Sequence, residues 1–168
     1  MAHVLQRELK QTKPFRSRQA EAYLNVLRTA EYLSREFEKC LKPHGLTGTQ
    51  YNVLRILRGA GVAGLACGDI AARLITHVPD VTRLLDRMER KGWLERARGR
   101  RDRRVVVTRI TPQGRALADR LDAPVLAAHA RLLEPLSDRE VKDLIRGLEK
   151  VRGNRRALPS PPWRATSM

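Results

Sequence analysis

The side chains best suited to chemistry form an arginine-rich run between two short apolar segments. Residues 98–104 read RGRRDRR, which is five arginines around one aspartate. A guanidinium carries a permanent charge and a planar set of N–H donors, so it suits phosphate oxygens and the edges of bases. The flanking residues 93–97 and 105–110 are strand candidates, the second rich in β-branched residues. The sequence therefore predicts a β-hairpin with a cationic tip, whose candidate contact residues are Arg98, Arg100, Arg101, Asp102, Arg103 and Arg104.

A second group of polar residues lies before this hairpin, at the start of a predicted helix. Apolar residues recur at helical spacing between residues 79 and 91, and Pro79 suits the first helical position. A shorter helix over residues 68–74 and a brief turn precede it. This order is typical of a helix-turn-helix, whose second helix enters the major groove of DNA. The candidate contacts on or just before its exposed side are Thr76, His77, Asp80, Thr82, Arg83 and Arg87.

Four of the polar side chains have more than one interpretation. Asp80 either accepts from a cytosine amine or stabilises the positive end of the helix. His77 is interpreted as a helix-start or phosphate contact, because the four histidines have no metal-ligand spacing with one another or with a cysteine. Cys40 and Cys67 are either small buried side chains or redox sensors, and Cys67 is the better sensor candidate because a helix start lowers a thiol pKa. We therefore expect no metal and no cofactor.

The distribution of charge supports a polyanionic partner. The 168 residues carry a formal net charge of +16. Residues 83–104 hold ten basic and four acidic side chains, which is +6, while residues 1–20 and 150–168 carry +4 and +5. The rest of the chain is nearly neutral. The central charge therefore lies on the predicted helix and hairpin, and the two tails are expected to attract DNA without reading its sequence.

Several classes of protein are excluded by what the sequence lacks. No apolar run approaches the ~18 residues of a membrane span, and residues 1–18 have no apolar signal region, so a soluble cytoplasmic protein is expected. Two cysteines are too few for a disulfide scaffold. We find no Gly-rich phosphate loop, no HExxH and no GxSxG, so the chain is not expected to be an enzyme.

Helices must position the two candidate groups. Apolar residues at a 3.6-residue period predict a long amphipathic helix over residues 18–41. Thr47 and Gln50 form a predicted capping box for a second helix, which gives way to a loop at residues 59–64. Thr111 and Pro112 open a later helix that Pro124 is expected to kink or break. A second capping box at residues 137–140 opens the last helix. The predicted fold class is therefore mainly α with a small β-hairpin wing.

The residues resemble one known family in several spaced elements. Leu46-Thr47-x-x-Gln50-x-x-Val53-Leu54 is similar to the opening of the MarR (multiple antibiotic resistance regulator) family core. The segments at residues 69–74 and 79–92 follow in the family's order. The clearest match is residues 102–114, where the family has Asp-x-Arg, a strand and then Leu-Thr-x-x-Gly. The resemblance covers roughly residues 20–152, and it departs at Asp80, where many members have Ser or Thr.

The resemblance implies a domain organisation and roles for several residues. It divides the chain into a basic arm (1–17), a MarR-like domain (18–152) and a disordered basic tail (153–168). The domain would hold a winged helix-turn-helix at residues 46–111, with dimerisation helices at 18–42 and 112–152. By matched position, Asp102 would brace the wing, Arg104 would enter the minor groove, and Thr82 and Arg83 would belong to the recognition helix.

The function implied is that of a homodimeric repressor. It would bind a pseudo-palindromic operator in double-stranded DNA and be released by a small aromatic ligand. Tyr51 and Cys67 are weak candidates to line the ligand pocket, and core packing is the alternative role for Tyr51. An alternative function is that of a nucleoid-type architectural protein that binds DNA without sequence preference.

Overall fold

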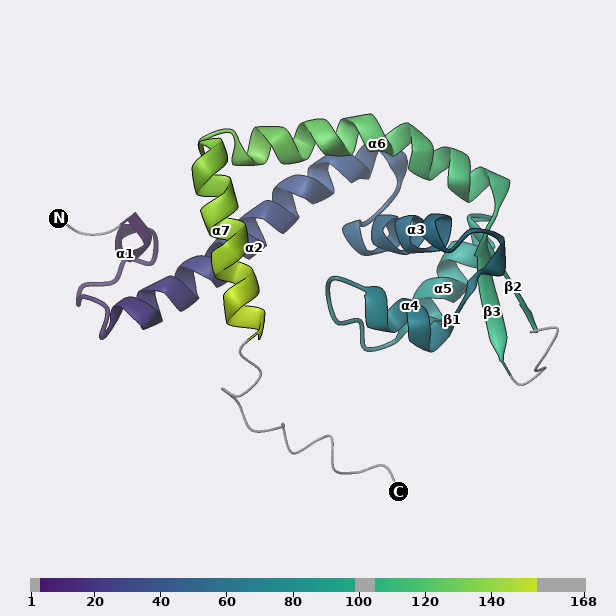
Figure 1. The fold of residues 1–168 in the computed structure, drawn as a ribbon, viewed down its shortest axis with the longest axis horizontal. Helices are drawn as coiled ribbons and strands as arrows, with labels where there is room; N and C mark the ends of the chain where they lie inside the picture. The colour runs from purple at the N-terminus through teal and green to yellow at the C-terminus, as the bar shows by residue number, and fades with distance from the viewer. Residues whose placement is uncertain (1–3, 99–104, 154–168) are drawn as a thin grey trace, which may run out of the picture. The chain divides into compact units, whose positions relative to one another are not determined.

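The computed structural model describes residues 4–98 and 105–153 and divides the chain into two compact units, Met1–His129 and Ala130–Met168. In chain order its elements are α1 (Val4–Glu8), α2 (Arg18–Leu41), the 3₁₀ helix η1 (Lys42–His44), α3 (Gly48–Ala60), the 3₁₀ helix η2 (Gly61–Ala63), β1 (Leu65–Ala66), α4 (Cys67–Arg73), α5 (Val81–Arg90), β2 (Leu94–Arg98), β3 (Val106–Ile110), α6 (Pro112–Leu133) and α7 (Asp138–Gly153) (Figure 1). This mainly helical architecture with a small sheet confirms the predicted fold class. The predicted wing residues Arg100, Arg101, Asp102, Arg103 and Arg104 lie outside the described residues, as does most of the predicted tail.

α2 is the long helix that the sequence predicts over residues 18–41. The hydroxyl of Ser17 accepts a hydrogen bond from the backbone N–H of Ala20 at 3.1 Å, which caps the first turn. After η1, Gly45 adopts φ +69°, a left-handed conformation that glycine reaches at no steric cost. The chain then turns back and enters α3, so the end of α2 is joined closely to the helix-turn-helix.

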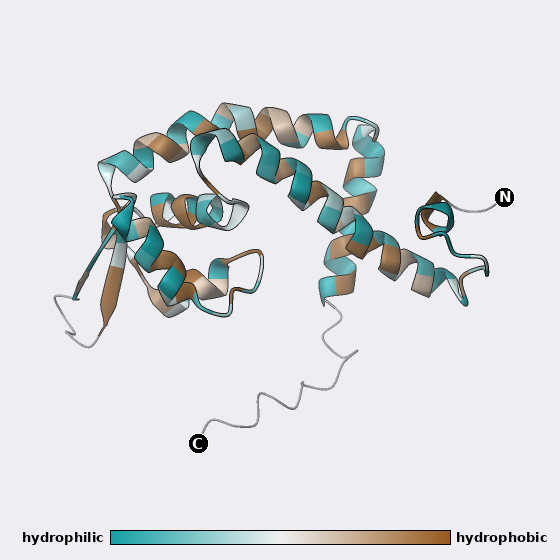
Figure 2. Ribbon diagram, turned by 180° about the vertical axis from the view of Figure 1, so that it is seen from behind, coloured by the Kyte–Doolittle hydropathy of each residue, from teal (hydrophilic) through white to brown (hydrophobic). Residues whose placement is uncertain are grey.

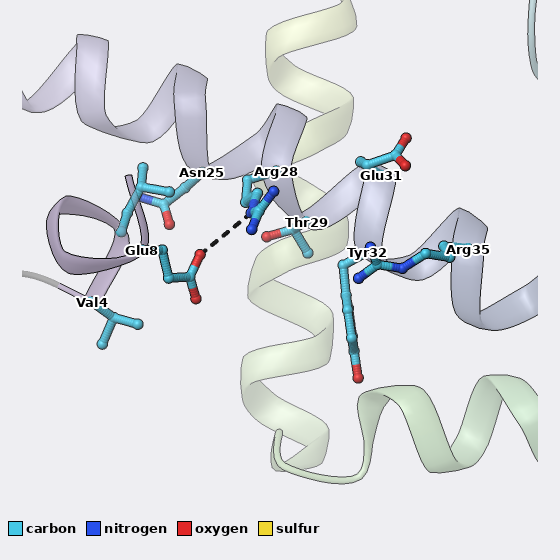
Figure 3. Close-up of a pocket in the computed structure, with 9 residues that line it drawn as sticks. Val4, Glu8, Asn25, Arg28, Thr29, Glu31, Tyr32 and Arg35 are labelled. Carbon is cyan, nitrogen blue, oxygen red and sulfur yellow. Dashed lines mark ion pairs between the residues drawn. The ribbon is translucent and has the colours of Figure 1, made fainter. Parts of the chain in front are cut away.

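A short helix in the N-terminal arm was not predicted. In α1 the side chain of Leu5 is 3% exposed, and the carboxylate of Glu8 lies 3.5 Å from the guanidinium of Arg28 on α2. A cavity of about 410 Å³ lies between the two helices, and Asn25 and Thr29 are among its lining residues (Figure 3). Five residues are too few to show a helical period, which is why the sequence did not reveal this helix.

α4 and α5 are the two helices of the helix-turn-helix, and α3 precedes them and packs against α4. The predicted capping box of α3 is confirmed: Thr47 Oγ1 accepts from Gln50 N–H at 3.2 Å, and Gln50 Oε1 accepts from Thr47 N–H at 3.0 Å. α3 continues to Ala60, two residues into the loop predicted at residues 59–64. The predicted start of α5 was wrong, because Asp80 is the N-cap and the helix begins at Val81. Pro79 therefore precedes the cap.

The three helices and the sheet enclose one apolar core. α2 and α6 also contribute to this core, and among its fully buried side chains are Leu41, Val53, Leu54, Leu57, Ile70, Leu85, Met88, Leu94 and Leu121. Figure 2 shows apolar and polar residues following one another along α2 and α6, the pattern of amphipathic helices. No helix in residues 4–98 or 105–153 is long and apolar enough to cross a membrane.

The sheet has three antiparallel strands in the order β1-β3-β2. β2 and β3 form the predicted hairpin, with Leu94 opposite Ile110 and Arg98 opposite Val106. β1 was not predicted, since it has two residues and no alternation to recognise. Gly64 precedes it with φ +66°, and a Cβ there would stand 2.6 Å from the carbonyl oxygen of Thr108. Close approach of the two backbones therefore requires glycine at this position.

α6 begins as predicted, with Thr111 as its cap. Thr111 Oγ1 accepts from Gly114 N–H at 3.0 Å and donates to the carbonyl of Gly92 at 2.6 Å. Pro124 was expected to kink or break this helix, and the break is wrong, because α6 runs from Pro112 to Leu133 through it. Cys40 Sγ lies 3.7 Å from the carbonyl oxygen of Pro124.

α7 belongs to the second unit. Its predicted capping box is confirmed, with Ser137 N–H donating to Glu140 Oε2 at 2.8 Å and Glu140 N–H donating to Ser137 Oγ at 3.4 Å. The bond from Ser137 holds the pKa of the Glu140 carboxyl below its ordinary value. None of its side chains is buried in this unit, although Leu144 and Ile145 are apolar.

Candidate nucleic-acid interface

α5 has an apolar face and a cationic face. Its apolar side chains point into the core and are at most 9% exposed; they are Val81, Leu84, Leu85 and Met88. At 3.6 residues per turn, Arg83, Arg87 and Arg90 lie together on the opposite side, and all three are exposed. Because core packing fixes the apolar face, the three guanidinium groups are held toward solvent, where a polyanion can reach them.

Asp80 is placed to stabilise the start of α5. Its Oδ1 accepts from the backbone N–H of Arg83 at 2.9 Å, and its Oδ2 lies 3.1 Å from Arg83 Nε. The carboxylate therefore satisfies a free N–H group at the helix start and holds one arginine side chain. Of the two interpretations of Asp80, these contacts favour the capping role.

The cationic face of α5 borders a surface hollow of about 600 Å³. Val78 and Pro79 form its apolar rim, and the charged side chains around it are Asp80, Arg83, Asp86, Arg87 and Arg90. In the described part of the chain, Arg87 makes no ion pair, so its guanidinium keeps all its donors for a ligand. The hollow is thus bordered by the positive charge of Arg87, on a helix whose opposite face is packed against the core.

The other predicted contact residues, Thr76, His77 and Thr82, are exposed near α5, but they do not all border the same hollow. His77 and Thr82 are exposed, and Thr82 Oγ1 lies 3.9 Å from Cys67 Sγ. Thr76 is exposed too, yet it lines a different cavity together with residues of α2 and α3. Within the described residues, no cluster of three His, Cys, Asp or Glu side chains could hold a metal.

The hairpin supplies the second predicted part of the interface. β2 and β3 extend away from the helices, and Arg98 is the last residue of β2, at the far end of the hairpin (Figure 1). Arg98 is exposed. The described part of the hairpin thus places one arginine of the predicted set, Arg98, at its exposed end.

Arg96 is a central residue of this region that sequence reasoning missed. It lies on β2, and its guanidinium pairs with both Asp86 and Glu89 of α5. The hydrogen bond to Glu89 raises the pKa of Arg96. Glu89 and Arg96 are seven residues apart, across a helix end and a turn, so neither helical nor strand spacing connects them.

Two further interactions fix the position of the helix-turn-helix. Lys91, which follows α5, lies 4.4 Å from the ring centre of Trp93 and donates to the carbonyl of Gly45 at 3.1 Å. On α3, Arg58 binds Asp119 at 2.7 Å and Asp122 at 2.8 Å on α6. The hydrogen bonds from Arg58 hold the pKa of the Asp122 carboxyl below its ordinary value.

The two weak ligand-pocket candidates occupy different environments. Tyr51 is 4% exposed in the core, and burial raises the pKa of its hydroxyl. Cys67 is half-buried at the start of α4. A cavity of about 290 Å³ lies between α2, α3 and the turn after α4, and its lining residues include Phe37, Asn52 and Thr76 rather than either candidate. Tyr51 contacts it indirectly, through its ring contact with Phe37.

Comparison with known proteins agrees with this geometry. A model of the MarR family matches residues 46–106, which include the helix-turn-helix and most of the hairpin. The multiple antibiotic resistance protein MarR of Salmonella typhimurium is 33% identical over 112 residues, which are 66% of this chain and 76% of that protein. The chain belongs to the MarR family.

Members of the MarR family are DNA-binding transcriptional regulators. The homoprotocatechuate degradative operon repressor of Escherichia coli is 29% identical over 125 residues, 74% of this chain and 83% of that protein. The crystal structure of a MarR transcription factor from Planctomyces limnophilus matches with a TM-score of 0.63 and 38% identity, over 81% of this chain and 98% of that one. This MarR-family protein is therefore a DNA-binding regulator built on a winged helix-turn-helix.

Proposed function

We propose that this protein is a homodimeric repressor that binds a pseudo-palindromic operator. The observation that carries the proposal is the arginine face of α5, held outward by a buried apolar face beside a hairpin that ends in arginine. Its similarity to an operon repressor supports the direction of regulation. In this proposal Thr82, Arg83 and Arg87 read base edges in the major groove.

The remaining contacts serve to place α5 on the duplex. Thr76, His77 and Arg98 bind phosphate, and the tip residues Arg100, Arg101, Arg103 and Arg104 reach the backbone or the minor groove. Asp102 braces the tip, and Asp80 caps the recognition helix. Phosphate contacts fix the register of a protein on DNA, while base contacts specify the sequence.

Dimerisation is supported by apolar side chains that each unit leaves exposed. On α2, Tyr23 is 64% exposed and Leu27 is 50% exposed. On α7, Ile145 is 51% exposed and Val151 is 76% exposed. Apolar surface of this kind is typical of a protein interface. We therefore propose that residues 18–42 and 112–152 form the dimer interface, as the resemblance to the MarR family implies.

Release by a small aromatic ligand is supported by the cavity between α2 and α3. The volume of this cavity, about 290 Å³, is close to that of the smallest typical ligand sites, and Phe37 supplies an aromatic surface. A ligand seated there would touch both a dimerisation helix and the helix-turn-helix. We propose that it changes the separation of the two recognition helices and so weakens DNA binding.

Competition binding tests the proposed function against the architectural alternative. A labelled duplex from the region upstream of the protein's own gene is bound, and random duplex is added. A specific regulator keeps its labelled duplex in a large mass excess of random DNA. Loss of the complex at equal mass would contradict the proposal and support binding without sequence preference.

A further inference from the structure

Two carboxylates lie on the helix that is proposed to face DNA. Asp86 borders the hollow beside Arg83 and Arg87, with 42% of its side chain exposed. Glu89 lies three residues later, with 35% of its side chain exposed. Left unpaired, carboxylates in this place would repel phosphate and oppose the charge of the arginines.

Arg96 binds both of these carboxylates. Its Nη2 lies 2.5 Å from Asp86 Oδ1 and 2.6 Å from Glu89 Oε2, and its Nε donates to Glu89 Oε2 at 2.8 Å. The backbone N–H of Arg96 also donates to Glu89 Oε1 at 3.0 Å. The side chain is 23% exposed. Its Nε and Nη2 donors are thus directed to the carboxylates of α5.

We propose that Arg96 is a positioning residue for DNA binding. Its single positive charge offsets one of the two negative charges of Asp86 and Glu89, and its contacts hold both carboxylates against β2, which reduces their repulsion of the phosphates that the arginines of α5 meet. The proposal rests on the proposed function in one respect, that this face of α5 meets DNA. Arg96 acts through the two carboxylates and makes no DNA contact of its own. Charge placed close to a polyanion acts strongly at low salt and weakly at high salt, because mobile ions screen it.

The first test replaces the guanidinium with an apolar side chain of similar length, Arg96→Met. We expect binding of the upstream duplex to weaken roughly tenfold at low salt, because two carboxylates lose their counter-charge. The deficit should shrink as salt is raised. An affinity within twofold of wild type at all salt concentrations would overturn the proposal.

The decisive test is rescue by removing the carboxylates. The triple variant Arg96→Met, Asp86→Asn, Glu89→Gln should bind within about threefold of wild type, since no charge is left to neutralise. If Arg96 contacted phosphate itself, or if the ion pairs were needed to hold β2 against α5, the triple variant would stay as weak as Arg96→Met. That result would overturn the proposal.

A second pair of substitutions keeps the test valid if Arg96→Met does not fold. The variant Asp86→Asn, Glu89→Gln retains Arg96 and should bind DNA as tightly as wild type or more tightly. Weaker binding by this variant would overturn the proposal, because it would show that the carboxylates themselves are needed. A thermal melt followed by circular dichroism establishes that each variant is folded at the assay temperature.

Arg109→Met is the matched control. Arg109 lies on β3, and its Nε donates to the carbonyl of Val62 at 2.9 Å rather than to a carboxylate. We expect the DNA affinity of this variant to change less than twofold, and a loss equal to that of Arg96→Met would overturn the specific role of Arg96.

All variants are measured on random duplex too. If wild type does not distinguish the two duplexes, the proposed function fails, while the order of the variants on random DNA still tests Arg96.

Discussion

Arg87 offers the sharpest test of α5 as the reading helix. Its guanidinium is exposed, and in residues 4–98 and 105–153 it makes no ion pair, so Arg87→Gln removes no internal interaction. The melting temperature should therefore stay within about 2 °C of wild type, as for other surface substitutions. A bidentate contact to a base contributes about 1–3 kcal/mol, which predicts a rise in Kd of roughly five- to 150-fold on the upstream duplex.

Fluorescence anisotropy at several salt concentrations separates the two roles that Arg87 can have. A base contact predicts a loss on the upstream duplex that is much larger than the loss on random duplex. A phosphate contact predicts equal losses and a salt slope smaller by about 0.9. The control is Arg55→Gln, an exposed arginine on α3 that lies outside the proposed DNA contacts and the proposed dimer interface, with the same change in charge. Kd values within twofold of wild type on both duplexes would refute the assignment of α5 to DNA.

Three further predictions concern stability and assembly. Because Arg58 lowers the pKa of Asp122 below its ordinary 3.8, this pair stabilises the fold above that pH and loses its effect as the pH falls through the lowered pKa. Arg58→Met should therefore lower the melting temperature at pH 7 and leave it nearly unchanged near pH 2. An equal decrease in melting temperature at both pH values would contradict this prediction. The Asp122 side chain is 53% exposed and that of Arg58 is 22% exposed, so screening keeps the loss at pH 7 at about 1 kcal/mol or below. Gly114→Ala would place a Cβ against the carbonyl of Trp93, so it should reduce soluble folded protein sharply; wild-type stability in a denaturant melt would show that the start of α6 can move. Ile145→Asp should turn a dimer into a monomer in sedimentation velocity if α7 forms the interface, and an unchanged dimer would remove α7 from it.

The sequence predicted the elements whose signals are local. The two capping boxes, the long period of α2 and the β-branched run of β3 each depend on residues close together in the chain, and each is present in the structure. The position of Pro79 was misjudged because a proline fits both the first helical turn and the residue before a cap. In the structure Asp80 is the N-cap, because its side chain accepts a hydrogen bond from the N–H of Arg83, and Pro79 is therefore the residue before the cap.

The features that the sequence did not predict depend on contacts between residues that are distant in the chain. α6 passes through Pro124, where the sequence predicted a kink or a break, and the nearby Leu121 and Val125 are buried in the core. Core packing outweighs one lost hydrogen bond there. β1 exists because Gly64 lets the backbone approach β3. The pairing of Arg96 with α5 likewise requires the hairpin to be folded, so a pattern of spacing within one element does not reveal it.

A DNase I footprint on the upstream region tests the central claim most directly. The account predicts protection over a pseudo-palindrome whose two half-sites lie one helical turn apart, roughly 10 base pairs from centre to centre, because a symmetric dimer places two recognition helices in successive major grooves. Arg87→Gln should lose this protection at concentrations where wild type retains it. Uniform protection of the whole fragment, or a footprint unaffected by Arg87→Gln, would contradict the account.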